Sequence, residues 1–445
     1  MNAMDNTKVH ILGGGPAGLT AGYYAKKQHL NFIIYEAGAM VGGNCRTIKL
    51  DNFRFDTGAH RFHDKDPAAT VEVKRLLGDD LLSVDAPSEI FFDDKFYRFP
   101  LELTDLIDKL GYSSLLKIAW DKLHSSGIRK IDNFETLALR RYGKTLAEQF
   151  LLNYSKKLWG LPTHDLSTAI SGNRLKGLDL WSFLRSTLFG TSKNPGHLDG
   201  TFFYPKYGIG MIPENLYEFI GKENVKLQHG VSRIIQKNGR IDRIILNGAI
   251  EIQTDVVINT LPLTLSLRIL DPPPPSALIS IVDNIKYRHL ILCVYCLKGG
   301  TFSQNASLYF PSEEFPFTRL YEPKNRSPYM APENKTVVVL EIPCFKDEEI
   351  WQKSDRDLNR TVWEGLCRVK SLKEDDIVHF QTFKLPFAYP VLEVGYEENV
   401  KRLVDYFKRF ENLYLTGRSS LFRYVHLHDL FKAGKEVVEQ IVDDY

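Results

Sequence analysis

The chain has 445 residues, a length that predicts two or three domains rather than one compact unit. Apolar residues make up 43% and charged residues 25%, the balance of an ordinary globular protein. A formal net charge of +2 gives no overall field for recruiting nucleic acid, and no apolar stretch is long enough for a membrane span. The five scattered cysteines and the short polar N-terminus lead us to expect a cytoplasmic protein without a disulfide framework.

The first predicted elements are a strand, a glycine-rich turn, a helix and a second strand. Apolar residues predict strands at 9–12 and 32–35, and helical periodicity begins at Leu19. The turn between them, Gly13-Gly-Gly-Pro-Ala-Gly18, has the spacing G-x-G-x-x-G, and the second strand ends at Glu36. In this context the glycines allow a tight turn and a close backbone approach to a pyrophosphate, while the acid binds ribose hydroxyls. The segment therefore predicts a dinucleotide-binding βαβ unit.

The middle of the chain changes from helical to strand-like patterning. Helical periodicity runs from about 66 to 190, interrupted by a strand-like segment at 90–98. Strand-like segments return between 227 and 260, and the proline run at 272–275 predicts a domain crossing.

The last third of the chain is predicted to be mainly strands, with a closing helix at 428–443. Cys293 and Cys296 form a C-x-x-C inside the apolar run 290–297, but no second cysteine pair or nearby histidine completes a zinc set. This run predicts a core strand.

The motifs that follow Glu36 favour FAD over NAD. The loop Val41-Gly-Gly-Asn-Cys-Arg46 and the segment Thr57-Gly-Ala-His60 resemble the superfamily of flavin amine oxidases, protoporphyrinogen oxidases and phytoene desaturases. Thr416-Gly-Arg418 resembles its closing motif, and Val231 resembles the valine whose backbone meets the adenine. The resemblance implies an FAD-binding enzyme. The residues that it places at the cofactor are Gly13, Gly15, Pro16, Ala17, Gly18, Glu36, Ala37, Gly43, Asn44, Arg46, Gly58, Ala59, His60, Val231, Gly417 and Arg418.

The resemblance and the predicted elements together imply a mixed α/β fold in three parts. A discontinuous Rossmann-like FAD-binding domain takes residues 1–65, 200–262 and 400–445. A helical insertion occupies 66–199, and a mainly antiparallel β substrate domain occupies 263–399. There is no second G-x-G-x-x-G on a strand, so any reductant or oxidant is expected to reach the flavin directly.

Within the superfamily, several segments resemble UDP-galactopyranose mutase, especially its eukaryotic form. They are Trp159-Gly-Leu-Pro162 with Ser171-Gly-Asn-Arg174, Leu308-Tyr309 with Arg319, Ala388-Tyr389-Pro390, and Arg423-Tyr424. A guanidinium binds diphosphate oxygens bidentately, and phenols donate to the remaining oxygens. The resemblance thus implies a small-molecule substrate, a nucleotide sugar, on Arg174, Tyr309, Arg319, Tyr389 and Tyr424.

The candidate catalytic residues are His60 and Arg61, because the resemblance implies that the segment Thr57–His60 borders the flavin ring. A histidine there would orient the flavin or move a proton; the alternative is a loop histidine bonded to backbone. His63, His426 and His428 do not have the spacing of a metal set, so no metal is predicted.

The sequence is compatible with three functions. The first is an FAD-dependent oxidoreductase acting at flavin N5 on a nucleotide-activated sugar or related metabolite. The second is a non-redox mutase-like isomerase in which reduced FAD is the nucleophile. The third is a flavoprotein without catalytic activity. The sequence leaves the oligomeric state open.

Overall fold

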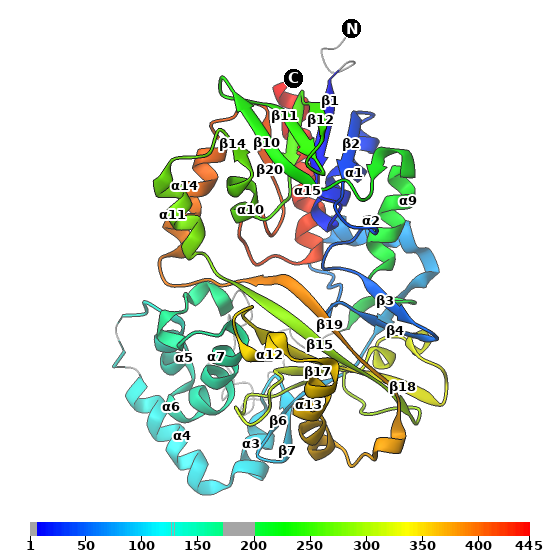
Figure 1. Cartoon of the computed structure of the whole chain (residues 1–445). Coiled ribbons are helices and arrows are strands. Elements are labelled where there is room, and N and C mark those ends of the chain that lie inside the picture. The colour runs from blue at the N-terminus through cyan, green and yellow to red at the C-terminus, as the bar shows by residue number, and fades with distance from the viewer. Residues whose placement is uncertain (1–6, 126, 129, 172–200) are drawn as a thin grey trace.

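The computed structural model describes residues 7–125, 127–128, 130–171 and 201–445. Figure 1 shows both described ends of the chain in one lobe, which holds a parallel sheet and its covering helices. A second lobe holds a large mixed sheet, with a group of helices beside it. In the described part of the chain, no helix is both long and apolar enough to cross a membrane.

The first lobe is built on a five-stranded parallel sheet in the order β20-β13-β1-β2-β9. Alternation in β1 sends Val9 and Ile11 to one face and His10 and Leu12 to the other. Helices α1, α9 and α15 cover the face of Val9 and Ile11. The elements are β1 (Lys8–Leu12), β2 (Asn31–Tyr35), β9 (Val225–Lys226), β13 (Val256–Asn259), β20 (Leu413–Leu415), α1 (Pro16–Lys27), α9 (Met211–Ile220) and α15 (Leu427–Asp444).

A second, four-stranded sheet in the order β12-β11-β10-β14 packs on the opposite face. Ile234 and Ile244 from this sheet join Leu12 and Val257 in one buried cluster. Its strands are β10 (Val231–Lys237), β11 (Arg240–Leu246), β12 (Ile250–Gln253) and β14 (Leu270–Asp271). The parallel sheet is therefore a middle layer between helices and antiparallel strands, as in Rossmann-like FAD-binding folds.

The second lobe contains a seven-stranded sheet in the order β19-β15-β18-β17-β16-β6-β7. Its pairs are antiparallel except β16 with β6. Cys293 and Cys296 lie fully buried in β15, which confirms the core strand expected there. The strands are β6 (Ser88–Phe92), β7 (Lys95–Phe99), β15 (Tyr287–Lys298), β16 (Ser307–Tyr309), β17 (Arg319–Tyr321), β18 (Lys335–Cys344) and β19 (Ile377–Pro390).

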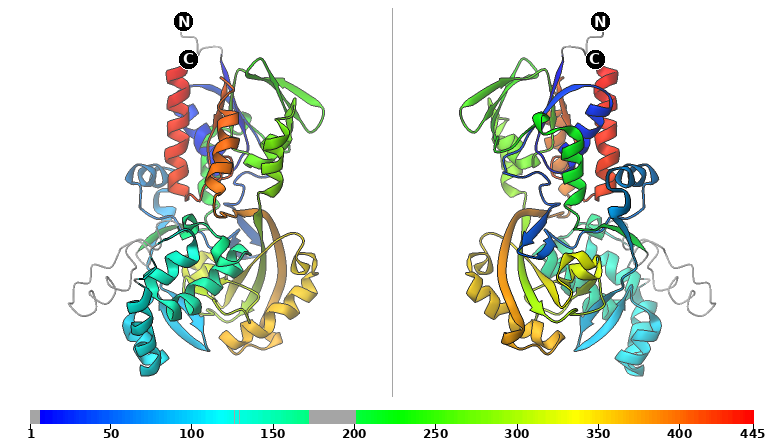
Figure 2. Two further views of the ribbon diagram at one scale, coloured as in Figure 1. Left: turned by 90° about the vertical axis from the view of Figure 1, so that its left-hand side faces the viewer. Right: turned by 90° about the vertical axis from the view of Figure 1, so that its right-hand side faces the viewer.

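Figure 2 shows β15 and β19 on one side of this lobe and helices α3–α7 on the other. The hairpin β6–β7 lies within the stretch expected to be a helical insertion, yet it extends the large sheet. The remaining helices are α2 (Pro67–Leu77), α3 (Leu103–Leu110), α4 (Tyr112–Ser125), α5 (Phe134–Tyr142), α6 (Lys144–Leu146), α7 (Asn153–Trp159), α10 (Leu263–Arg268), α11 (Ser276–Asn284), α12 (Glu349–Gln352), α13 (Asp355–Val369) and α14 (Tyr396–Phe407).

Two small sheets complete the fold, and they pair β3 (Thr47–Leu50) with β4 (Phe53–Asp56) and β5 (Leu81–Val84) with β8 (Phe202–Pro205). The predicted fold class, a mixed α/β protein with parallel and antiparallel sheets, is confirmed. The three-part division at the boundaries given above stays a proposal.

Candidate active site

The glycine-rich turn places backbone where side chains do not fit. Gly13 has a φ of 104°, a region that favours glycine. A Cβ on Gly18 would lie 1.9 Å from the carbonyl oxygen of Gly13. Helix α1 begins at Pro16 with Gly15 as its N-cap, and no side chain caps it. The positive end of α1 is therefore left to bind an anion, as a cofactor pyrophosphate requires.

The carboxylate of Glu36 is fixed beside this turn. It accepts hydrogen bonds from the backbone N–H groups of Gly14 and Gly38, both at 2.7 Å. A Cβ on Gly14 would lie 2.8 Å from the Cβ of Glu36. The acid thus stands at the end of β2, where a dinucleotide places its ribose.

Two further segments close around the turn. A Cβ on Gly43 would lie 3.3 Å from the Cα of Gly15, and the N–H of Gly42 donates to the carbonyl of Gly14 at 2.9 Å. From the far end of the chain, a Cβ on Gly417 would lie 2.6 Å from the Cβ of Ala17.

Arg46, at the end of the loop that contains Gly43, provides a test of whether these residues fit FAD. Its Nε is buried and has no hydrogen-bond partner in the described part of the chain. A guanidinium nitrogen left in this state suits a bound acceptor. The donor set and the backbone cradle therefore fit a dinucleotide.

His60 is tied to the backbone beside this cradle. Its Nε2 lies 2.9 Å from the carbonyl oxygen of Asn44, which can only accept, so Nε2 carries the proton. Burial, and then the charge of Arg319, lowers the pKa of His60 to about 4. The ring is neutral near pH 7, and its Nδ1 is an acceptor that has no hydrogen-bond partner among the described residues.

Arg61, the second candidate catalytic residue, has partners on two strands. Its Nη2 donates to the Ser88 hydroxyl at 2.7 Å, and its guanidinium lies 4.8 Å from the centre of the Phe202 ring. These contacts connect Arg61 to β6 and β8. A catalytic role for either His60 or Arg61 stays a proposal.

Arg319 on β17 forms a buried ion pair with Glu341 on β18. Its Nε and Nη2 donate to the same carboxylate oxygen at 2.8 Å and 2.6 Å. The other oxygen of Glu341 accepts the N–H of Ala59 at 2.9 Å. Glu341 therefore joins β17 to the segment beside His60. Sequence reasoning missed it; its signal is a single acid inside the apolar run 336–342.

Tyrosines gather around this pair. Tyr309 is the strand partner of Arg319 in the β16–β17 pair. The guanidinium of Arg418 lies 5.3 Å from the Tyr389 ring centre and 5.0 Å from that of Tyr424. Burial raises the pKa of Tyr389 to about 12, with the negative charge of Glu341 the next cause, so its phenol is a hydrogen-bond donor at neutral pH.

The substrate residues expected from the sequence thus come together where they are described; Arg174 lies outside the described residues. Helix α7 adds Tyr154, whose ring centre is 6.0 Å from that of Tyr309. Trp159 on the same helix lies 6.1 Å from Tyr389, ring centre to ring centre. Tyr154 escaped the sequence reasoning because a tyrosine on a helix carries no specific signal.

Lys157 holds the loop that joins β16 to β17. Its ammonium donates to the carbonyls of Phe310, Ser312 and Phe317 at 2.8, 2.7 and 3.0 Å. Burial lowers the pKa of Lys157 to about 7. These three hydrogen bonds join α7 to the loop between Tyr309 and Arg319.

The three C-terminal and loop histidines do not make a metal centre. The rings of His426 and His428 stack with centres 5.6 Å apart. Burial, and then Lys65, lowers the pKa of His63 to about 3. In the described ranges, no group of three or more His, Cys, Asp or Glu side chains could hold a metal ion.

A glycine turn opening a helix, an acid at the end of the second strand and a buried arginine Nε without a partner among the described residues together define a dinucleotide-binding flavoprotein of the Rossmann-like class. The chain belongs to the family of flavin containing amine oxidoreductases, which it matches over residues 16–442. It is therefore a flavin-dependent enzyme, and its cofactor is FAD.

Relatives and solved structures agree with this membership. Coproporphyrinogen III oxidase of Bacillus subtilis (strain 168) is 21% identical over 493 aligned residues, covering 98% of each chain. Protoporphyrinogen oxidase 1 of Spinacia oleracea is 23% identical over 79% of this chain and 70% of its own length. The crystal structure of a reduced UDP-galactopyranose mutase matches with a TM-score of 0.86 and 21% identity over 98% of this chain and 96% of its own. At this identity the structural match shows the fold.

Proposed function

We propose that this enzyme is an FAD-dependent oxidoreductase whose substrate is a nucleotide-activated sugar or a related anionic metabolite. One observation carries the proposal: Arg319 and Arg418 lie among Tyr309, Tyr389 and Tyr424, beside His60. Two guanidinium groups among tyrosine side chains suit an anion with several oxygens.

The chain's own residues would divide the work between binding and proton transfer. Arg418 and the phenols would hold the anionic group, while Glu341 keeps Arg319 in place through the contacts at 2.8 Å and 2.6 Å. Bound oxidised FAD supplies a hydride acceptor at N5. The neutral His60, with its free Nδ1, would accept the proton of the substrate hydroxyl as the carbon loses hydride, which leaves a carbonyl product.

Glu341 narrows the substrate class. Because it neutralises Arg319 from one side, the pair contributes directed N–H donors more than net positive charge. A diphosphate ester bonded through its oxygens fits this arrangement better than a free multivalent anion, which would need uncompensated charge.

A mutase-like isomerase is the second candidate. The likeness over nearly the whole chain to a reduced UDP-galactopyranose mutase, with a TM-score of 0.86, favours it. In that case the same arginines and tyrosines would hold the leaving diphosphate, and the enzyme would need FAD in its reduced form.

An anaerobic titration of the purified holoenzyme with a panel of nucleotide sugars separates the two. Bleaching of the visible flavin band by one sugar establishes the oxidoreductase and names its substrate class. Turnover only after chemical pre-reduction establishes the isomerase. If every sugar leaves the band unchanged and none is converted in either state, the nucleotide-sugar proposal is wrong.

Tyr389→Phe and Tyr329→Phe provide matched variants for this titration. Tyr389 lies at the site, whereas Tyr329 is 47% exposed on another surface. Only Tyr389→Phe is expected to raise the sugar concentration needed for half-maximal bleaching or turnover.

A further inference from the structure

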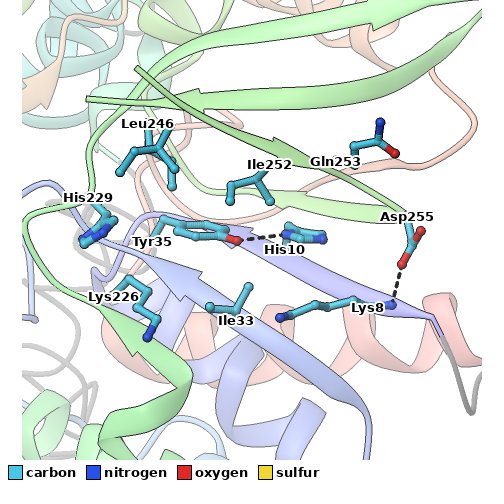
Figure 3. A pocket seen from close by; sticks show the side chains of 11 residues that line it. Lys8, His10, Ile33, Tyr35, Lys226, His229, Leu246, Ile252, Gln253 and Asp255 are labelled. Atoms are coloured by element: carbon cyan, nitrogen blue, oxygen red, sulfur yellow. Dashed lines mark hydrogen bonds between the residues drawn. The ribbon is translucent and has the colours of Figure 1, made fainter. Parts of the chain in front are cut away.

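A hollow of about 470 Å³ lies between the parallel sheet and the antiparallel sheet of the first lobe. Figure 3 shows His10 and Tyr35 on its floor and Leu246 and Ile252 on its roof. Neither the glycine turn nor Glu36 is among the residues that line it, so it is separate from the FAD cradle.

The hollow exists because the two layers do not close over β1 and β2. Ile250 and Ile252 lie on the same face of their sheet as Leu246 and Ile244, their strand partners, so they point toward the parallel sheet. Ile250 is nevertheless 43% exposed. Apolar side chains between packed sheets normally interdigitate, and here the strands below offer a polar floor instead.

The floor of the hollow carries a buried polar pair, His10 and Tyr35, in which one ring nitrogen can still form a hydrogen bond. His10 Nδ1 lies 3.1 Å from the Tyr35 hydroxyl, and the two residues are only 3% and 4% exposed. Among the described residues, Nε2 of His10 has no hydrogen-bond partner. Burial, and then the charge of Lys8, lowers the pKa of His10 to about 4, so the ring is a neutral partner near pH 7.

The rim of the hollow is cationic. Lys8 and Lys226 line it, and within the described ranges neither ammonium group has an ion-pair partner. One carboxylate, Asp255, lies at the same edge, where it accepts the backbone N–H of Lys8 at 2.9 Å. The local balance therefore favours a ligand with negative charge.

We propose that this hollow is a binding site for a small planar aromatic carboxylate. A slot between two β layers admits a flat ring, and Leu246, Ile250 and Ile252 give it an apolar roof. The lysines would bind the carboxylate from the rim, and the His10–Tyr35 pair would bond it from the floor.

The site is connected to the cofactor through the backbone. The N–H of Glu36 donates to the carbonyl of Lys226 at 2.9 Å, and the N–H of His229 donates to the carbonyl of Glu36 at 2.8 Å. Tyr35 directly precedes Glu36. A ligand that orders Lys226 and His229 would therefore also order the residue that holds the FAD ribose, so binding should tighten FAD.

Calorimetric titration of the FAD-loaded enzyme with 2-naphthoate tests the proposal. One saturable site is expected, and Lys226→Glu should weaken binding about tenfold through the lost charge-assisted contact. Lys237→Glu, a charge change on the same lobe outside the hollow, should bind as the wild type does. The neutral analogue 2-naphthamide should bind about tenfold more weakly than the acid.

The His10 ring gives a second readout. Its pKa, followed by NMR, should rise when 2-naphthoate binds, because a nearby carboxylate favours the protonated form. Ile252→Trp, which fills the hollow from its roof, should abolish both the heat of binding and this shift. Lys226→Gln replaces Lys226→Glu if the reversal lowers the FAD content.

Three results would overturn the site. They are no saturable binding, equal affinity of Lys226→Glu and the wild type, or release of FAD as 2-naphthoate binds. The last would mean that the ligand occupies the cofactor cradle instead.

Discussion

The FAD cradle and the proposed substrate face offer different atoms for binding. In the cradle, residues 13–18 offer backbone groups, and the turn can form only because Gly13, Gly14 and Gly18 lack side chains that would clash with neighbouring protein atoms. On the proposed substrate face, ring and guanidinium groups would do the binding, and they come from β16, β17, β19 and the segment after β20. One site depends on the absence of Cβ atoms, and the other depends on buried polar partners.

This difference predicts different failures. A single added side chain should destroy the cradle, because backbone has no room to move aside. On the proposed substrate face, each single substitution should lower the affinity only in part, because several side chains bind the substrate together. Breaking the Arg319–Glu341 ion pair, which supports this face, should have a larger effect.

Gly18→Val should abolish FAD binding. Its Cβ would lie 1.9 Å from the Gly13 carbonyl oxygen, which is backbone and cannot yield without displacing the turn. The purified variant should lack the visible flavin band and fail to recover it on incubation with FAD. Gly127→Ala, whose Cβ would be 3.4 Å from its nearest neighbour, is the control and should retain FAD. A yellow Gly18→Val protein would contradict this account of the cradle.

Glu341→Ala should lower the free energy of unfolding by about 3–5 kcal/mol, because it leaves Arg319 as an uncompensated charge in a buried setting. Denaturant unfolding followed by circular dichroism measures the change. Replacing both partners, Arg319→Met with Glu341→Met, should restore most of the loss. If Glu341→Ala left the free energy of unfolding nearly unchanged, Arg319 would have to be solvated in the native state.

Acid should destabilise the protein through His60. The pKa of His60 is lowered from 6.5 to about 4 in the native state, so between these values the unfolded chain binds a proton that the native chain does not. The contribution of His60 to the free energy of unfolding is therefore fully present above pH 6.5. It falls as the pH drops toward 4, by at most about 1.4 kcal/mol per pH unit.

His60→Gln should make this dependence shallower, as measured by unfolding midpoints across the same pH range. His379→Gln, on the exposed surface of β19, should leave it unchanged. An identical slope in His60→Gln would mean that His60 titrates normally in the native state.

Tyr389→Phe should have the smallest effect, about a 3- to 10-fold rise in KM for the substrate identified by the titration, because one neutral hydrogen bond is lost. Steady-state kinetics should show kcat nearly unchanged. A large fall in kcat with an unchanged KM would instead make Tyr389 part of the chemical step.

The cofactor half of the molecule could be predicted from the sequence because its determinants are local. A glycine turn between a strand and a helix, followed by an acid at the end of the next strand, predicts dinucleotide binding at that spacing. The uninterrupted apolar run 290–297 also predicted the core strand β15, and the predicted elements together with the family resemblance implied the mixed α/β class. These features depend on residues that are close together in the chain, so they can be read from the sequence.

Only the tertiary structure decided which distant residues meet. The period of residues 90–98 predicts a strand, but not that β6 pairs with β16 of the large sheet. Glu341 is an ordinary acid until the β17–β18 register places it against Arg319. The hollow above His10 arises because two sheets fail to close, and no local pattern encodes such a gap. Strand register and layer packing depend on the whole chain, since each is set by the sum of contacts made elsewhere.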